Sequence, residues 1–575
     1  MDVKRLLLLI PLAVLAYLLV IQWNQDYGQT TYDSTPEITQ SSNGAPANES
    51  GSDDLSVPST SAPNNAISEG VGDEQSDTAS RDFIAVTTDV LDVRIDPFGG
   101  DIVYAALPQH KLTLDSDRNY VLLSDNATRS YVARSGLQLD GQASRIAFTP
   151  ERNEYRLGDD EEQISVDLTA NVNGVDVIKR LTFERGSYAV NVSYYLANNT
   201  EAPVSARFIG QLARDNSPDP SSGVAMGMNS YLGAAYSTPE ARYEKIDFDT
   251  IQKRNFENRE AQGGWIAIIQ HYFVSAWAPP QNQQNLYYVT TDSRDRNVVA
   301  FAGPTSSVAP EGEATLSATL YMGPKVQDYL EQVAPNLKLT VDYGWLWFIA
   351  NPLFWLLDKI HDIVGNWGWS IVLLTVLVKL VLFPLSAKAY KSMARMRKLG
   401  PEMQRLKEMY GDDRQKMSQE MMKFYQKEKI NPLGGCLPIL VQMPVFIALY
   451  WMLLESVELR HAPFFGWIQD LSAADPTSVF NLFGLIPWTP PDFLLIGVWP
   501  LIMGASMYLQ QKLNPQPTDP MHAKIFQFLP IMFTFLLARF PAGLVIYWAV
   551  NNVLSMSQQW VIMKRMGISG KDALK

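Results

Sequence analysis

The sequence has almost no cysteine, since Cys436 is the only one among 575 residues. A fold held together by disulfides and a cysteine-rich metal site are therefore both excluded. The five histidines are scattered without the spacing of metal ligands, and no glycine-rich phosphate loop is present. We therefore predict no metal site, no cofactor and no nucleotide chemistry. The histidines are His110, His271, His361, His461 and His522.

The net charge of −13 conceals two unlike halves. Residues 1–341 hold 25 basic and 44 acidic residues, a net charge of −19, whereas residues 342–575 hold 22 and 16, a net of +6. A chain of this length exceeds one ordinary domain. We therefore expect a membrane protein that carries a large, acidic, water-exposed domain, and no nucleic-acid site.

The chain begins with the apolar stretch Leu6–Ile21 behind two basic residues. A cleaved signal peptide would have the same pattern, but no small-residue cleavage site follows. We therefore predict a transmembrane anchor over residues 1–23. Residues 24–80 are rich in small, polar and acidic residues and form a flexible linker, because they cannot bury enough apolar surface to order the chain.

Residues 81–340 consist of short segments in which apolar and polar residues alternate. Examples begin at Tyr188 and Leu286, and turn residues such as Pro97 and Gly99 separate such segments. This pattern is typical of a large antiparallel β-sandwich domain.

The C-terminal part is dominated by apolar segments that suit membrane helices. Residues 343–365 are rich in aromatic residues but interrupted by proline and charges, which favours an amphipathic helix in the membrane interface. Beyond it we predict five spans, at about residues 366–387, 430–454, 493–511, 525–539 and 543–563. With the anchor this gives a polytopic α-helical membrane bundle of six spans.

The charges of the loops orient this bundle. Residues 388–429 carry 12 Lys and Arg, whereas residues 455–492 carry only Arg460 against five acids. By the positive-inside rule, residues 388–429 and both termini are cytoplasmic, and the β-domain lies outside the cytoplasm. A chain with six spans places each of these segments on the side of the membrane that its charge predicts.

Lys379 is the most informative residue of the predicted core, because it lies inside the apolar run Ile371–Phe383. A charge at the centre of a bilayer costs about 2.5–3.5 kcal/mol, so a functional role is the first hypothesis. The alternative is a lysine whose amine reaches the cytoplasmic interface. Thr375 lies one helical turn earlier, on the same face.

The last span supplies a polar stripe, and Gln442 adds an amide from the span 430–454. Ordinary interhelical hydrogen bonding would explain any one of these residues. Together with Lys379 they predict a wet, positively charged cavity inside the membrane. The spans contain no carboxylate or nucleophile–base pair, so we predict no catalytic residue. The stripe comprises Tyr547, Trp548, Asn551, Asn552, Ser555, Gln558 and Gln559.

The cytoplasmic segment 388–429 is predicted to form a helical hairpin that turns at residues 411–413. Seven methionines lie in it, and flexible, polarizable methionine suits a surface that receives varied apolar partners. The alternative is that several of them form the seam of the hairpin itself. They are Met393, Met396, Met403, Met409, Met417, Met421 and Met422.

Three motifs resemble those of the YidC membrane protein insertases: NPLGGCLPILVQMPVF from Asn431, SVELR from Ser456 and FPAGLVIYW from Phe540. The resemblance is dense over residues 345–563, and the layout is similar to that of the Gram-negative bacterial form. It implies an insertase and chaperone, not an enzyme, in the cell inner membrane. The large domain would be periplasmic, a β-supersandwich related to sugar-binding folds.

The resemblance further implies a five-helix core around a hydrophilic groove, in which Lys379 attracts polar or acidic parts of a client. Thr375, Gln442 and Trp548 match groove positions. The implied partners are nascent membrane proteins, the ribosome, a Sec translocon and membrane lipids.

The sequence departs from the family in two respects. Family members of this form usually have Arg where this chain has Lys379, and only 12 residues follow Met563, so a long ribosome-binding tail is not expected. Two other functions compete with insertion: a transporter or channel in which Lys379 binds an anionic solute, and a membrane-anchored sugar-modifying enzyme.

Overall fold

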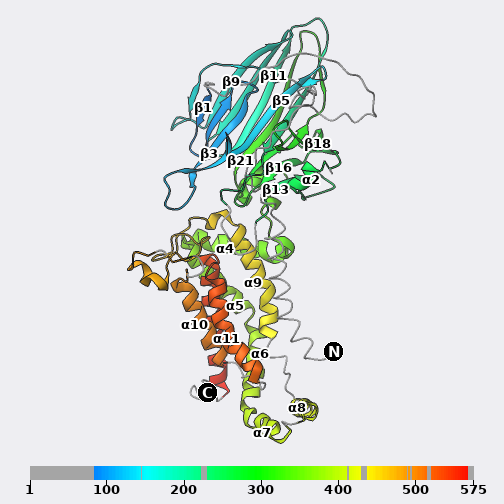
Figure 1. The fold of residues 1–575 in the computed structure, drawn as a ribbon. Coiled ribbons are helices and arrows are strands. Elements are labelled where there is room, and N and C mark those ends of the chain that lie inside the picture. Colours follow the sequence, from blue (N-terminus) through cyan, green and yellow to red (C-terminus); the bar gives the residue numbers. More distant parts are fainter. Residues whose placement is uncertain are drawn as a thin grey trace, which may run out of the picture.

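The computed structural model describes residues 83–143, 145–221, 230–254, 256–410, 413–428, 437–488, 490–491, 495–513 and 520–566. The predicted anchor and linker, residues 1–80, lie outside these ranges. Figure 1 shows a β-sheet domain at one end of the molecule and a bundle of helices at the other. The predicted fold class, a large β-sandwich followed by a helical region, is confirmed.

The β-domain consists of two sheets. Twelve strands form the first sheet, and among the described pairings only β1 with β8 is parallel. Its main path is β15 (Arg259–Gln262), β18 (Gln284–Thr291), β19 (Asn297–Ala302), β12 (Val204–Arg214), β5 (Arg129–Leu139), β4 (Asn119–Asn126), β3 (Asp101–Lys111), β2 (Asp92–Asp96), β1 (Ile84–Thr87) and β8 (Glu154–Arg156), with β20 (Ser306–Val308) and β6 (Gln142–Ala143) at its sides. The second sheet runs β14 (Glu244–Ile246), β13 (Gly233–Ser237), β16 (Trp265–Ile269), β17 (Phe273–Ala278), β21 (Glu313–Pro324), β11 (Ala189–Asn198), β10 (Val175–Glu184), β9 (Gln163–Val172) and β7 (Thr149–Pro150).

Strand β10 illustrates why these residues form a sandwich. Val175, Val177, Leu181 and Phe183 are buried, as is Lys179 on the same face, whereas the alternate residues on the other face are wholly or partly exposed. Because successive side chains of a strand point to opposite faces, this alternation places one largely apolar face of β10 against the first sheet. Most buried apolar residues of both sheets belong to one continuous core, whereas others, such as Val132, Ile209 and Tyr288, form a separate cluster within the first sheet.

The helical part follows strand β21. Two short helices accompany the β-domain, α2 (Phe248–Gln252) and α3 (Gln327–Val333). The remaining helices are α4 (Trp347–Val364), α5 (Trp367–Val381), α6 (Phe383–Lys398), α7 (Gly400–Tyr410), α8 (Arg414–Lys427), α9 (Leu437–Glu455), α10 (Val498–Leu513), α11 (Pro520–Leu537) and α12 (Ala542–Arg565). Short 3-10 turns occur at Leu337–Thr340, Gly344–Leu346, Val457–Leu459 and Val479–Gly484.

The segment predicted as one span over residues 366–387 is divided into α5 and α6, which meet at an angle of 68°. Pro384 lies in the first turn of α6 and lacks the N–H that would continue α5. Within the described residues, no single helix has both the length and the apolar character to cross a membrane. The bent pair Trp367–Val381 and Phe383–Met396 meets both conditions together.

Helix α4 lies at the end of the bundle that faces the β-domain (Figure 1). Its buried residues Ala350, Leu357 and Ile360 pack into the core, whereas Trp347 and Trp355 are more than half exposed. This helix is therefore amphipathic, with large aromatic side chains on its outer face.

The β-domain and the bundle share one hydrophobic core and are joined by polar contacts. The ring Nε2 of His271 lies 2.9 Å from the Leu454 carbonyl oxygen at the end of α9. The Arg460 guanidinium donates hydrogen bonds to the carbonyls of Lys111 and Leu112, at 2.7 and 2.9 Å. These contacts fix the end of α9 against the β-domain.

Candidate functional site

The candidate site is built around Lys379 in α5. Asn366 caps this helix, because its side chain accepts a hydrogen bond from the Trp369 backbone N–H. The apolar residues that follow continue the helix to Val381 and carry Lys379 into the bundle, where its side chain is 4% exposed. The bundle thus holds a lysine that is almost fully shielded from solvent.

The Lys379 ammonium contacts two other helices. Its Nζ donates to the Ser555 hydroxyl in α12 at 2.7 Å and to the Gln442 side-chain carbonyl in α9 at 3.2 Å. The Gln442 amide in turn donates to the Asn551 side-chain oxygen, and the Ser555 hydroxyl donates to the Asn551 backbone carbonyl at 2.6 Å. Three predicted site residues are therefore linked to Lys379 in one hydrogen-bonded cluster.

Charge is not balanced in this cluster. Among the residues that the structure describes, no carboxylate lies within ion-pair distance of Lys379. Its two partners are neutral, so they satisfy the hydrogen bonds of the ammonium without compensating its charge. Such a site favours the approach of an anionic group.

The other predicted groove residues have different surroundings. The Thr375 side chain is buried, and its hydroxyl donates to the Ile371 carbonyl one turn earlier, at 2.7 Å. The Tyr547 ring is buried and stacks against Phe446, with 6.2 Å between centroids. Trp548 packs edge-on against the same Phe446 at 4.4 Å. In the part of the chain that the structure describes, the hydrogen bonds of the Lys379 amine go to Ser555 and Gln442 and not to these three residues.

The polar residues of α12 form hydrogen bonds on two different sides of the helix. Asn551 and Ser555 face Lys379, whereas the Asn552 amide donates to the Ser506 hydroxyl of α10 at 3.0 Å. The Gln559 amide donates to the Leu513 carbonyl at 2.9 Å. Sequence reasoning missed Ser506, although a hydroxyl beside Gly504 in an uncharged run was a usable signal.

The seven methionines do not form one surface. Met393 and Met403 are buried, and Met393 packs against Ile562 of α12. Met409 and Met422 are at least half exposed, and the remaining three are partly buried: Met396, Met417 and Met421. The predicted turn at residues 411–413 lies between α7 and α8, and its first two residues are outside the described ranges.

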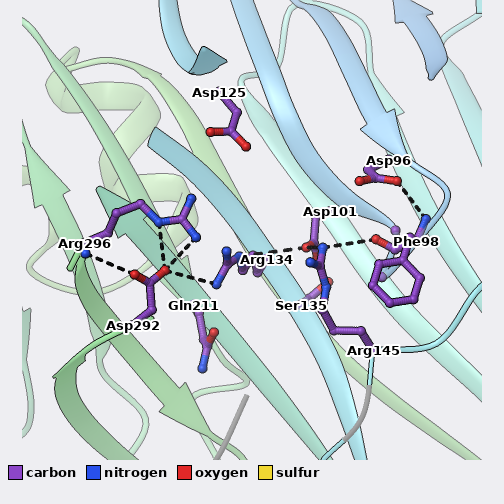
Figure 2. Close-up of polar contacts among 12 residues, drawn as sticks. Asp96, Phe98, Asp101, Asp125, Arg134, Ser135, Arg145, Gln211, Asp292 and Arg296 are labelled. Carbon is purple, nitrogen blue, oxygen red and sulfur yellow. Dashed lines mark hydrogen bonds and ion pairs between the residues drawn. The ribbon is translucent and has the colours of Figure 1, made fainter. Parts of the chain in front are cut away.

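A second buried polar cluster lies in the β-domain (Figure 2). Asp292 accepts a hydrogen bond from Arg296 Nε at 2.7 Å and lies 3.6 Å from Arg134 Nη1. Asp101 pairs with Arg134 and with Arg145. Burial acts to raise the pKa of Asp292, but the contacts with Arg296 and Arg134 hold that pKa below its usual value. The alternating charges thus stabilise one another across the sheet.

Among the described residues, no group of three or more His, Cys, Asp and Glu side chains is placed to hold a metal ion. The two acids of the β-domain cluster, Asp101 and Asp292, are each engaged by arginine.

Comparisons with known proteins agree across the whole chain. Residues 83–356 match the family model of the YidC periplasmic domain, and residues 359–569 match that of the 60Kd inner membrane protein. A membrane protein insertase YidC of Stutzerimonas stutzeri (strain A1501) is 48% identical over 582 residues, covering 100% of both chains. One of Azotobacter vinelandii (strain DJ) is also 48% identical, covering 98% of this chain and 99% of that protein. A crystal structure of an active YidC insertase with its first transmembrane domain resolved shares 18% identity, covers 84% of this chain and 92% of that chain, and has a TM-score of 0.37.

Proposed function

Because the chain belongs to the YidC family of inner-membrane protein insertases, we propose that the cluster around Lys379 is where it receives its clients. The family's activity is the insertion of membrane proteins, which is not an enzymatic reaction. The residues proposed to line the receiving groove are Thr375, Lys379, Gln442, Tyr547, Trp548, Asn551 and Ser555.

The uncompensated charge of Lys379 is the observation that carries this proposal. The amine is buried, and the groups within hydrogen-bond reach are the neutral Ser555 and Gln442. A structural lysine would gain more from a carboxylate partner in such surroundings. An amine held by neutral acceptors can instead exchange one of them for a carboxylate of an arriving polypeptide.

The mechanism follows from the solvation of polar groups. A client helix must bring a polar flank through lipid, where each unsatisfied polar group costs several kcal/mol. A hydrophilic groove that reaches partway across shortens this dry path, and Lys379 offers a counter-charge to acidic residues. Transfer of the client's apolar segment into lipid then drives completion, with no nucleotide hydrolysed by this chain.

Further parts of the proposal concern topology and partners. Six spans would place both termini and α6–α8 in the cytoplasm, where exposed methionines such as Met409 and Met422 receive apolar client segments. The β-domain would lie in the periplasm. Chaperone activity, cooperation with a Sec translocon and docking of the ribosome at the basic α6–α8 region belong to the same proposal.

Site-specific photo-crosslinking tests the client site. A photoreactive residue at Asn551 of α12 is expected to crosslink to the arrested nascent chain of a single-span client. Val553 provides the matched control, because it lies two residues further along α12, on another face, and is 48% exposed. Crosslinks of equal strength from both positions, or only from Val553, would contradict the proposed groove.

Flux measurements separate insertion from transport. Proteoliposomes that hold the purified chain are expected to insert client polypeptide without leaking small anions. Anion flux in the absence of polypeptide, lost on substitution of Lys379, would favour the transporter instead.

A further inference from the structure

The segment between α9 and α10 exposes a cluster of large apolar side chains. No charged residue occurs from residue 476 to residue 491. Six apolar side chains near the centre of this stretch are between 42% and 83% exposed: Phe480, Leu482, Phe483, Leu485, Ile486 and Trp488. We call residues 479–488 the apolar loop.

Backbone hydrogen bonds hold the apolar loop in a defined shape. The Phe483 N–H donates to the Ser478 carbonyl at 2.8 Å, and the Ile486 N–H donates to the Asn481 carbonyl at 3.1 Å. At its base, the Val479 N–H donates to the Ile496 carbonyl at 3.1 Å. The apolar side chains are therefore displayed by a closed, hydrogen-bonded turn.

The base of the loop is tied to the bundle through Asp475. This carboxylate is buried and accepts hydrogen bonds from the Thr477 hydroxyl at 2.6 Å, from the Trp467 indole at 3.2 Å and from the Trp499 backbone N–H in α10 at 2.9 Å. These hydrogen bonds therefore fix the position of the apolar loop relative to the helices.

The conformation of the loop is unfavourable in water. Leu482 and Phe483 have φ angles of +48° and +59°, a region in which each residue costs on the order of 1–2 kcal/mol. The two side chains are also 52% and 54% exposed, so in water they do not gain the free energy of apolar burial. Both penalties are offset if the side chains meet an apolar medium.

The position of the loop identifies that medium. Figure 1 shows the segment before α10 projecting sideways from the bundle, near the end that carries α4. Exposed aromatic residues continue around this end: Trp369 at the start of α5 stacks on Phe465, with centroids 6.1 Å apart, and Trp355 projects from α4. Aromatic side chains in such a belt suit the boundary between lipid headgroups and acyl chains.

We infer that the apolar loop is a membrane anchor, inserted into the headgroup and upper acyl region of the leaflet on the β-domain side. The partner is a phospholipid surface, recognised through apolar contact alone. Because the loop carries no charge, its insertion does not require anionic lipid and is insensitive to salt. The inference concerns a surface distant from the Lys379 cluster and does not depend on the proposed client site.

Depth-dependent quenching tests the anchor. Single cysteines replace Leu485, Phe483 or, as control, Glu201 in an exposed turn of the β-domain, each in full-length protein that carries Cys436→Ser. Each is labelled with the fluorophore NBD in phosphatidylcholine nanodiscs. We expect blue-shifted emission at 483 and 485, quenched by lipids that carry a nitroxide near the headgroup, and water-like, unquenched emission at 201.

The alternatives give different results. Water-like emission at 483 and 485 in nanodiscs that hold one protein would overturn the inference. Blue-shifted emission without lipid quenching would assign the loop to a protein partner or a second copy and would equally overturn it. Quenching at 483 that is lost in 1 M salt, or that appears only with anionic lipid, would contradict the uncharged mode of insertion.

Discussion

The ammonium of Lys325 and the carboxylate of Glu455 lie 2.9 Å apart and join the β-domain to the end of α9. Their side chains are only 2% and 6% exposed. Lys325 directly follows strand β21, and Glu455 is the last residue of the helix that carries Gln442. The orientation of the β-domain is thus coupled to a helix of the proposed client site.

We expect Lys325→Met to destabilise the full-length protein by about 3–5 kcal/mol, because it leaves a buried carboxylate without its counter-charge. Adding Glu455→Gln should restore part of that loss. Denaturant unfolding of the purified protein in detergent measures both effects. Lys359→Met, which removes an exposed ion pair with Asp362, is the control and should leave stability unchanged. Additive effects of the two junction substitutions would show that the pair does not interact.

Substituting Lys379 by Ala should slow the insertion of single-span clients with acidic tails by about tenfold or more, which corresponds to ~1.4 kcal/mol of lost attraction. Lys379→Arg should retain most activity, since the charge remains. Clients with uncharged tails should be affected least, which separates loss of charge from loss of fold. Protease protection of the client tail in proteoliposomes measures insertion. Equal slowing of acidic and uncharged clients would contradict a role for the charge.

Sequence patterns identified residues that the structure brings together in the candidate cluster, but they did not predict the geometry within it. Lys379 stood out because a charge in an apolar run is costly, and the polar residues of α12 stood out by their helical spacing. Which of them meets Lys379 depends on how α12 is rotated against α5 and α10. Asn551 and Asn552 are neighbours in sequence, but Asn551 bonds to Gln442 of α9 and Asn552 bonds to Ser506 of α10. The spacing of polar residues along one helix does not determine how that helix is rotated against its neighbours.

The junction could not be predicted for a related reason. Lys325 and Glu455 are separated by 130 residues and pair only after both parts have folded. The division of the predicted span 366–387 had a visible signal in Pro384, which a count of apolar residues overlooks. The exposure of the apolar loop could not be predicted either, because its length and lack of charge do not determine which way its side chains point.

Glu458 should make the stability of the junction depend on pH. Burial raises its pKa to about 7, and the charges of Asp358 and Asp328 act in the same direction, whereas Lys325 opposes them. The unfolded pKa is about 4.3. The folded state therefore binds more protons between these values, so stability falls as pH rises from about 4.5 to 7 and then stays low.

Glu458→Gln should therefore be more stable than the parent chain at pH 7.5, by on the order of 1–3 kcal/mol, and should lose this advantage near pH 4.5. The difference between the two unfolding curves cancels the contributions of His110 and His271. Burial lowers the pKa of each of these histidines, which makes stability rise with pH. A difference that does not change with pH would show that Glu458 keeps an ordinary pKa.

Gly504 should be intolerant of a side chain, because an added Cβ would overlap the Thr534 hydroxyl where α10 packs against α11. Thr534 is held in place, since its hydroxyl donates to the Pro530 carbonyl at 2.8 Å. We therefore expect Gly504→Ala to destabilise the bundle by about 1–3 kcal/mol. Combining it with Thr534→Ala removes the overlapping atom and should recover much of the loss, beyond the small effect of Thr534→Ala alone. A double-mutant cycle on unfolding midpoints measures this coupling. If the two changes prove additive, helices α10 and α11 do not meet at this pair.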